Sequence, residues 1–168
     1  MIKRQILLFL YSFLGITLFT FAQSNSPIKN IYAVYMVHIP GNIPVDRNGN
    51  AISTFDTSTI IYVESTPTFI LWVKVWKNNK SYSILSTPIA NSYLDVGTKN
   101  TSNEKMIIRV SKENKLWQLQ LSPDEKNTSI PSRIKLAPGE ILLQTIYRGK
   151  KNFKRITYQT ELRSIPSV

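Results

Sequence analysis

Alternation of apolar and polar side chains runs through most of this chain and predicts β-strands. The clearest alternation spans 116–121, where Trp117, Leu119 and Leu121 share one face and glutamines separate them. Three further runs are rich in the β-branched and aromatic residues that favour strands: 31–38, 59–64 and 68–77. No segment of ten or more residues repeats its apolar positions with the helical period of about 3.6. We therefore expect an all-β domain.

Turn signals between these runs predict consecutive hairpins. Asn48-Gly49 is the strongest short hairpin signal in the chain. Short polar turns predict three later hairpins: 68–77 with 81–86 through 78–80, 105–110 with 116–121 through 112–114, and 140–148 with 153–165 through 149–152. Two short strands, 93–96 and 133–136, are expected inside the long loops. Hairpins without crossover helices indicate a single antiparallel β-sandwich or a barrel-like meander of hairpins.

The N-terminus has the pattern of a signal peptide. Lys3 and Arg4 precede a long apolar stretch, and Thr20 and Ala22 have the small-x-small spacing of a cleavage site. We expect cleavage after Ala22 or Gln23. The expected organisation is as follows: 1–23 signal peptide, 24–30 short polar lead-in, 31–168 single β-rich domain.

An uncleaved membrane anchor over residues 5–22 is the alternative, because its 18 residues are at the lower edge of what crosses a bilayer. The leader resembles bacterial ones, so we expect a bacterial protein that is periplasmic, at the cell surface or secreted. The chain has no cysteine, which excludes thiolate chemistry, thiolate zinc sites and a lipidated N-terminal cysteine.

Positive charge is the first candidate functional feature, since 21 basic and 10 acidic residues give a net charge of +11. Five cations fall within eight residues at the last predicted turn: Arg148, Lys150, Lys151, Lys154 and Arg155. Arg163 follows on the returning strand of the same predicted hairpin. Such a cluster attracts an anionic glycan, an anionic membrane surface, extracellular DNA or an acidic protein, without base-specific recognition of nucleic acid. The alternative is that lysines flank the turn for solubility and block pairing at a sheet edge.

Tryptophans are the second candidate feature. Trp72 and Trp76 share one predicted strand face about 13 Å apart. Three more aromatic residues extend the row: Trp117, Tyr82 and Tyr93. If the row lies on an exposed sheet face, we expect it to bind sugar rings. The alternative is that these side chains pack in the core, because aromatic side chains bury well. Trp76 is expected to be the more exposed of the first two, since Lys74 shares its face.

The sequence shows no catalytic or metal-binding constellation. Its one imidazole, His38, lies at a strand end and is expected to be structural. The sequence leaves open a long-range pair of carboxylates, such as Glu64 with Glu161, of the kind that a glycosidase uses. Asp124 and Glu125 are expected to be solvated. The segment 46–50 resembles a calcium loop, but its glycine is fourth rather than sixth, so we expect a turn. We predict a protein that is not an enzyme and has no cofactor or metal.

These observations favour an exported, non-enzymatic binding or envelope-associated domain that contacts an anionic partner through the basic hairpin. One alternative is a carbohydrate-binding or glycan-cleaving module that uses the tryptophans. Another is a barrel that carries an apolar ligand, because Leu, Ile, Val and Trp suit such an interior.

Overall fold

The computed structural model describes residues 26–38, 46–49 and 56–164, and within them the chain forms strands and turns without a helix. The predicted signal peptide lies outside these residues. No helix long and apolar enough to cross a bilayer occurs in the described part of the chain. The strands are β1 (Ile28–His38), β2 (Asp56–Ser65), β3 (Leu71–Lys77), β4 (Lys80–Ile89), β5 (Tyr93–Thr98), β6 (Lys105–Arg109), β7 (Lys115–Pro123), β8 (Ile141–Tyr147), β9 (Lys150–Ile156) and β10 (Gln159–Leu162).

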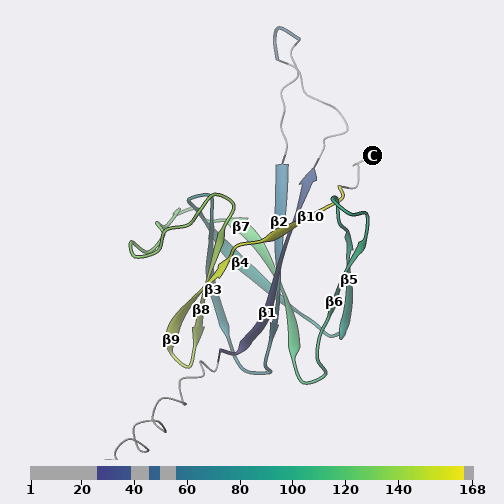
Figure 1. Ribbon diagram of the computed structural model, residues 1–168. Helices are drawn as coiled ribbons and strands as arrows, with labels where there is room; N and C mark the ends of the chain where they lie inside the picture. Colours follow the sequence, from purple (N-terminus) through teal and green to yellow (C-terminus); the bar gives the residue numbers. More distant parts are fainter. Residues whose placement is uncertain (1–25, 39–45, 50–55, 165–168) are drawn as a thin grey trace, which may run out of the picture.

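Eight strands form one curled sheet in the order β10-β1-β2-β7-β4-β3-β8-β9, and the curl makes a half-barrel (Figure 1). The sheet is mixed, because β1 and β10 run parallel while the other neighbours are antiparallel. The strands β5 and β6 pair only with each other in a second sheet. The all-β prediction is confirmed, but the arrangement is neither a purely antiparallel sandwich nor a simple meander.

The main core fills the concave side of the half-barrel. Apolar side chains from β1, β2, β3, β7, β8 and β9 meet there, and Ile61, Val63 and Leu143 are fully buried. Burying a side chain of this kind stabilises the fold by about 1.5–3 kcal/mol. The predicted alternation in β7 is confirmed, since Leu119 is buried in this core while Trp117 and Leu121 pack against it.

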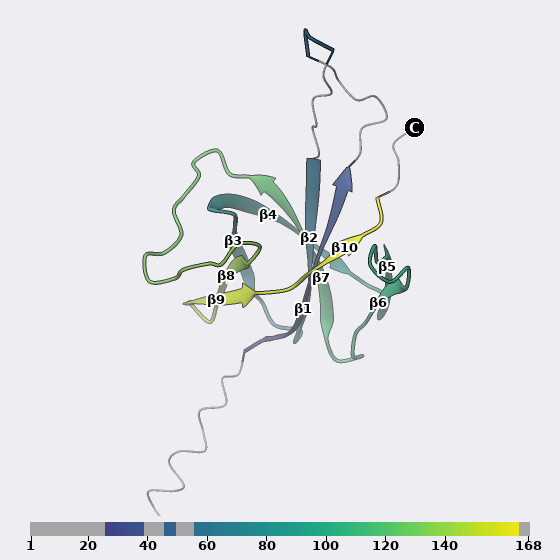
Figure 2. The same ribbon diagram turned by 45° about the horizontal axis from the view of Figure 1, so that its top comes forward.

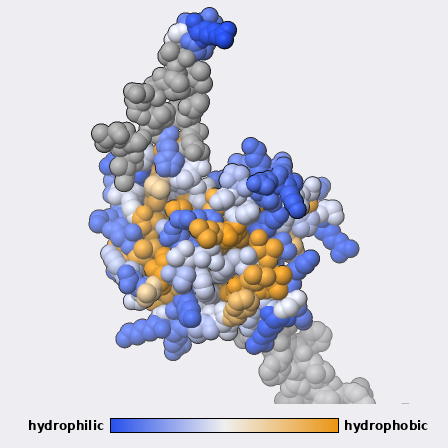
Figure 3. Space-filling view, turned by 180° about the vertical axis from the view of Figure 1, so that it is seen from behind, coloured by the Kyte–Doolittle hydropathy of each residue, from blue (hydrophilic) through white to orange (hydrophobic). Residues whose placement is uncertain are grey.

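A second core lies between the two sheets. Val34, Tyr62 and Leu116 face away from the concave side and pack with Ile108 of β6 and Leu162 of β10. The strand β2 is therefore covered on both faces, which explains its continuous apolar run. The face of the molecule opposite to that in Figure 1 shows apolar patches interrupted by hydrophilic side chains (Figure 3).

Two predicted hairpins are confirmed, and each turns through two residues with positive φ. Asn78 (φ 50°) and Asn79 (φ 60°) join β3 to β4. Arg148 (φ 50°) and Gly149 (φ 72°) join β8 to β9. Left-handed φ at both positions is the type I′ geometry that matches strand twist. The last turn is thus one residue earlier and shorter than predicted, and its return strand divides into β9 and β10.

The predicted hairpin between 105–110 and 116–121 is wrong. The two strands belong to different sheets, because β6 pairs with β5 while β7 pairs with β2 and β4. The turn between them is held by the buried Glu64 of β2, which accepts hydrogen bonds from the Asn114 side chain (2.6 Å) and the Ser111 N–H (3.3 Å). The polar turn residues 112–114 do not indicate that the chain passes from one sheet to the other at this point.

The loop strands were predicted with mixed success. The segment 93–96 is part of β5, as expected. The segment 133–136 is not a strand; it belongs to a loop in which the Ile134 N–H bonds to the Pro131 carbonyl. At the Asn48-Gly49 signal, the Gly49 N–H bonds to the Asp46 carbonyl (3.0 Å), so the turn is present, although its flanks lie outside the described residues.

Glu64 supplies a test of this architecture. It joins three segments, since the Asn30 side chain of β1 also donates to it (2.6 Å). Burial alone would raise the pKa of Glu64, but the hydrogen bonds from Asn114, Asn30 and Ser111, with nearby Lys29, hold it below its usual value.

Replacing Glu64 with Ala should lower the free energy of unfolding by about 2–3 kcal/mol, because buried donors lose their charged acceptor. Urea denaturation measures the change. The exposed Glu125→Ala should stay within about 0.5 kcal/mol of wild type, and an equally small effect at Glu64 would contradict this role.

Candidate functional site

The half-barrel has an open seam between β9 and the first half of β1. The chain runs from β9 through residues 157–158 into β10, which pairs in parallel with β1 over Ala33–Met36 (Figures 1 and 2). Before that point β1 has a ladder with β2 on one side, and none of the described residues pairs with its other side. The two strand paths therefore meet at β10 and separate towards the β8–β9 turn.

A groove of about 540 Å³ occupies the wide end of this seam. Its lining combines the start of β1 with the β8–β9 hairpin: Ser26, Pro27, Ile28, Thr145, Tyr147, Arg148, Lys150, Asn152, Phe153 and Lys154. A second groove of about 310 Å³ continues along the same seam, between Ile31–Ala33 and residues 155–160. The free edge of β9 thus borders these two grooves rather than another strand.

Strand alternation divides the basic cluster between two faces. Lys150 and Lys154 pair with Tyr147 and Leu143, whose side chains belong to the concave side, and both lysines line the groove. Lys151 pairs with Ile146, one residue out of phase, and so points to the other face. The sequence cluster becomes two groove lysines with Arg148 at the tip, where its guanidinium lies 5.2 Å from the Tyr147 ring centroid.

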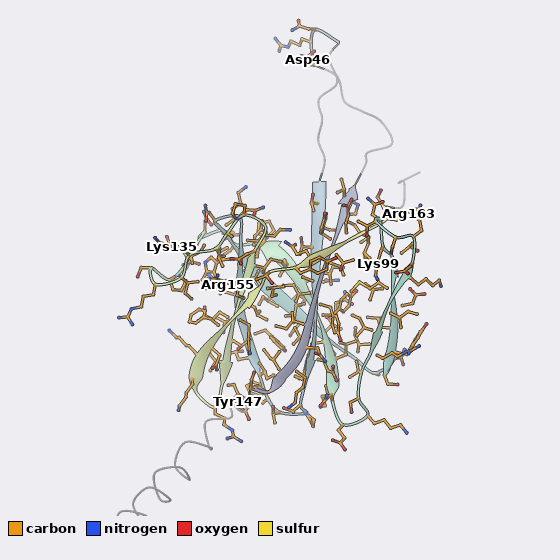
Figure 4. All side chains as sticks on the ribbon, in the orientation of Figure 1. Asp46, Lys99, Lys135, Tyr147, Arg155 and Arg163 are labelled. Carbon is orange, nitrogen blue, oxygen red and sulfur yellow. The ribbon has the colours of Figure 1, made fainter. Side chains whose placement is uncertain are left out.

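The two remaining arginines have other roles. Arg155 lies 3.6 Å from the Glu140 carboxylate and donates to the Lys135 carbonyl, so it fastens the loop before β8. Arg163 is not on the same hairpin as predicted: it donates to Asn103 (2.6 Å), and Figure 4 shows it near Lys99, away from Tyr147 at the hairpin tip. The reason is the parallel crossover, which carries the chain to the opposite edge of the sheet.

Positive charge in the groove has no local counter-charge. The sequence has no acidic residue between Glu140 and Glu161, and Arg148, Lys150 and Lys154 form no ion pair with any residue in the described part of the chain. By contrast, Lys74, Lys99 and Lys105 each pair with a carboxylate. The groove cations are therefore available to an external anion.

Burial argues against the tryptophan row as an exposed platform. Trp72 exposes 9% and Trp76 only 4% of its surface. A bulge explains this: Trp72 pairs with Thr145 and Lys74 with Gln144, so one extra residue shifts the phase of β3. The bulge places Trp72 in the concave core and Trp76 on the opposite face, contrary to the prediction that they share a face and that Trp76 is the more exposed.

The other members of the row are also dispersed. Trp117 is half-buried against Trp72, with ring centroids 6.0 Å apart, and Tyr82 packs on the same core. Tyr93 is exposed on β5, in the other sheet. Trp72 and Trp117 do contribute to the lining of a groove of about 430 Å³, together with the exposed Phe69. The predicted row is thus mainly core packing.

A polar cluster covers Trp76. Its indole N–H donates to the Thr128 carbonyl (2.8 Å), and the loop that holds Thr128 is fixed by Asp124. The Asp124 carboxylate accepts from Lys74 (2.5 Å) and Ser81 (2.9 Å), and these bonds lower its pKa from 3.8 to about 2. The expectation that Asp124 is simply solvated is wrong.

The other candidate catalytic groups lie far apart. Glu64 is level with Asn30 and Glu161 with Tyr35, so their backbone positions are about 16 Å apart along β1 and lie on strands on its two sides. This placement does not suit a glycosidase pair, whose carboxyl groups are about 5–9.5 Å apart. His38 is exposed at the end of β1, 2.9 Å from the Ser58 hydroxyl. Among the described residues no group of three or more His, Asp or Glu side chains is placed to hold a metal.

Sequence reasoning missed Lys77, which lies beside a groove of about 580 Å³ at another part of the half-barrel. Its ammonium donates to Thr59 (2.7 Å) and lies 5.8 Å from the Tyr35 ring centroid. Burial lowers the pKa of Lys77. No sequence pattern joined Lys77 to Thr59, because the contact spans strands that are separated in the sheet order.

No family model, curated protein or solved structure matches this chain.

Asp124 gives a pH-dependent prediction. Because its folded pKa is about 2 and its ordinary value is 3.8, it stabilises the fold above about pH 4 and loses this effect as the pH falls towards 2. Asp124→Asn should therefore unfold at a lower temperature than wild type at pH 7, and the difference should shrink at pH 3. Thermal unfolding followed by tryptophan fluorescence measures both, with Glu125→Gln as the control. A difference independent of pH would contradict the assignment.

Proposed function

We propose that this protein is an exported binding domain that captures an anionic partner in the groove between the β8–β9 hairpin and the start of β1. The observation that supports it best is the convergence of Arg148, Lys150 and Lys154 on one groove without a counter-charge. A volume of about 540 Å³ is in the range of binding clefts, about 300–1,000 Å³. Such a set of cations holds an anion by charge, and we propose binding as its activity.

The groove is built on paired strands, which position its cations. The whole of β9 pairs with β8, and β8 in turn pairs with β3, an interior strand of the sheet. Apolar and aromatic surface from Ile28, Tyr147 and Phe153 flanks the charged side chains. A low-dielectric wall beside an unpaired cation concentrates the field there, which favours an anion over water.

The conformation of Arg148 also supports a binding role. It adopts φ 50° in a type I′ turn, at a position where Asn, Asp or Gly is usual. A left-handed conformation costs a residue with a Cβ about 1–2 kcal/mol. A guanidinium held at the groove rim at that cost is the pattern expected where function, rather than turn stability, determines the residue.

Removing the two groove lysines should weaken polyanion binding. With heparin as the probe, Lys150→Ser/Lys154→Ser should bind about tenfold more weakly than wild type, and its affinity should vary less between about 50 and 200 mM salt. Calorimetric titration at each salt concentration measures both effects.

The matched control is Lys112→Ser/Lys126→Ser, which removes the same charge from two exposed lysines outside the groove. The control should stay within about threefold of wild type, since distant exposed charges are screened. Equal losses in the two double variants would show that net charge alone binds the probe, and the proposal would fail.

A substitution at Arg148 should affect the stability of the fold and the binding of heparin differently. Arg148→Asn suits the turn better but loses the contact with Tyr147, so the free energy of unfolding should stay the same or rise by up to about 1 kcal/mol. Heparin binding should nevertheless weaken. Urea denaturation and the same titration measure the two quantities, and a less stable variant with unchanged affinity would contradict both expectations.

A further inference from the structure

The edge of β9 that borders the seam presents unpaired backbone groups. A two-residue turn closes on a hydrogen-bonded pair, here Tyr147 with Lys150, and hydrogen-bonded pairs then alternate along the hairpin. The pairs of Asn152 and Lys154 with β8 are therefore hydrogen-bonded. Lys151, Phe153 and Arg155 turn their N–H and C=O groups away from β8, and no backbone bond from the described residues meets them.

The start of β1 presents the opposite edge of the seam. Residues 28–32 have β2 on one side only, because the parallel ladder with β10 begins at the pair Ala33–Gln159. Continued backwards, that register would place Ile28 opposite Lys154, and both residues instead line the groove. Two strand edges thus follow one another along the seam without pairing.

We propose that the partner is an extended acidic polypeptide segment that adds to the sheet as a strand in this seam. The inference rests on the proposed function and narrows its anion to a protein backbone with carboxylate side chains. Strand addition uses main-chain hydrogen bonds for affinity and alternate side chains for specificity. A glycan or a lipid head group satisfies the cations but has no regular row of N–H and C=O groups for the β9 edge.

The side-chain pattern sets the composition of the segment. Lys150 and Lys154 are four residues apart on the groove side of β9, so about 13 Å separates them. A strand whose carboxylates recur at every second residue presents one to each lysine. Pairing of β9 with the β9 of a second copy is unfavourable, because this strand has four cations and no acidic residue and would repel itself.

Peptide probes test the backbone directly. A ten-residue peptide of alternating Glu and Thr is compared with two isomers, N-methylated at two Glu or at two Thr nitrogens. In a strand, alternate residues direct their backbone groups to opposite edges. At least one isomer should bind about tenfold more weakly than the parent, although its charge is unchanged.

Variants of the protein test the same edge. Lys151→Pro and Lys151→Ala both remove the charge, but only proline removes the N–H that faces the seam. Proline is tolerated at edge strands in this orientation, and equal melting temperatures of the two variants establish that both fold. The proline variant should bind the parent peptide about tenfold more weakly than the alanine variant.

The outcomes separate this inference from the proposed function. If both N-methylated isomers bind as tightly as the parent peptide, strand addition is wrong, whatever heparin does. If heparin binding depends on Lys150 and Lys154 but the peptide does not bind, the groove recognises an anion other than a polypeptide. If neither probe depends on these lysines, both proposals fail.

Discussion

The incomplete pairing of β1 determines the shape of this protein. On one side β1 is paired with β2 throughout, but on the other side β10 covers only Ala33–Met36. A longer β10, or a β9 that stayed beside β1, would close the curled sheet into a barrel. Because the β8–β9 hairpin instead diverges from β1, the sheet remains a half-barrel with an open seam. The side chains on its concave side pack against one another to form the main core. The groove is a consequence of where this ladder stops.

Charge and strand geometry act together at the seam. An exposed strand edge is a hazard for self-association, and lysines on β9 protect it, since two copies repel each other. The same lysines leave the edge accessible to a chain of opposite charge. Protection against self-pairing and the acidic partner that we propose therefore rest on the same charge. Lysines that block pairing at the sheet edge, the alternative offered by the sequence, are thus compatible with the proposed binding role.

Local patterns predicted what depends on neighbours in sequence, and failed where the structure depends on distant contacts. Period-two alternation located most strands, and Asn78-Asn79 located its turn. The sheet change between β6 and β7 depends on Glu64, 47 and 50 residues from the groups it binds, so the turn signal there gave a false hairpin. For the candidate site, the basic cluster was visible, but its division between two faces and the start of β1 were not. One bulged residue in β3 was enough to separate Trp72 from Trp76.

Amide hydrogen exchange in β9, followed residue by residue by NMR, shows whether a bound partner joins the sheet at this edge. In the free protein the N–H groups of Asn152 and Lys154 should be protected by β8, while those of Lys151, Phe153 and Arg155 exchange rapidly. With the alternating Glu-Thr peptide bound, these three amides should become protected. A bound peptide that leaves all three exchanging as fast as in the free protein would contradict the account, because the partner would then be held by charge without joining the sheet.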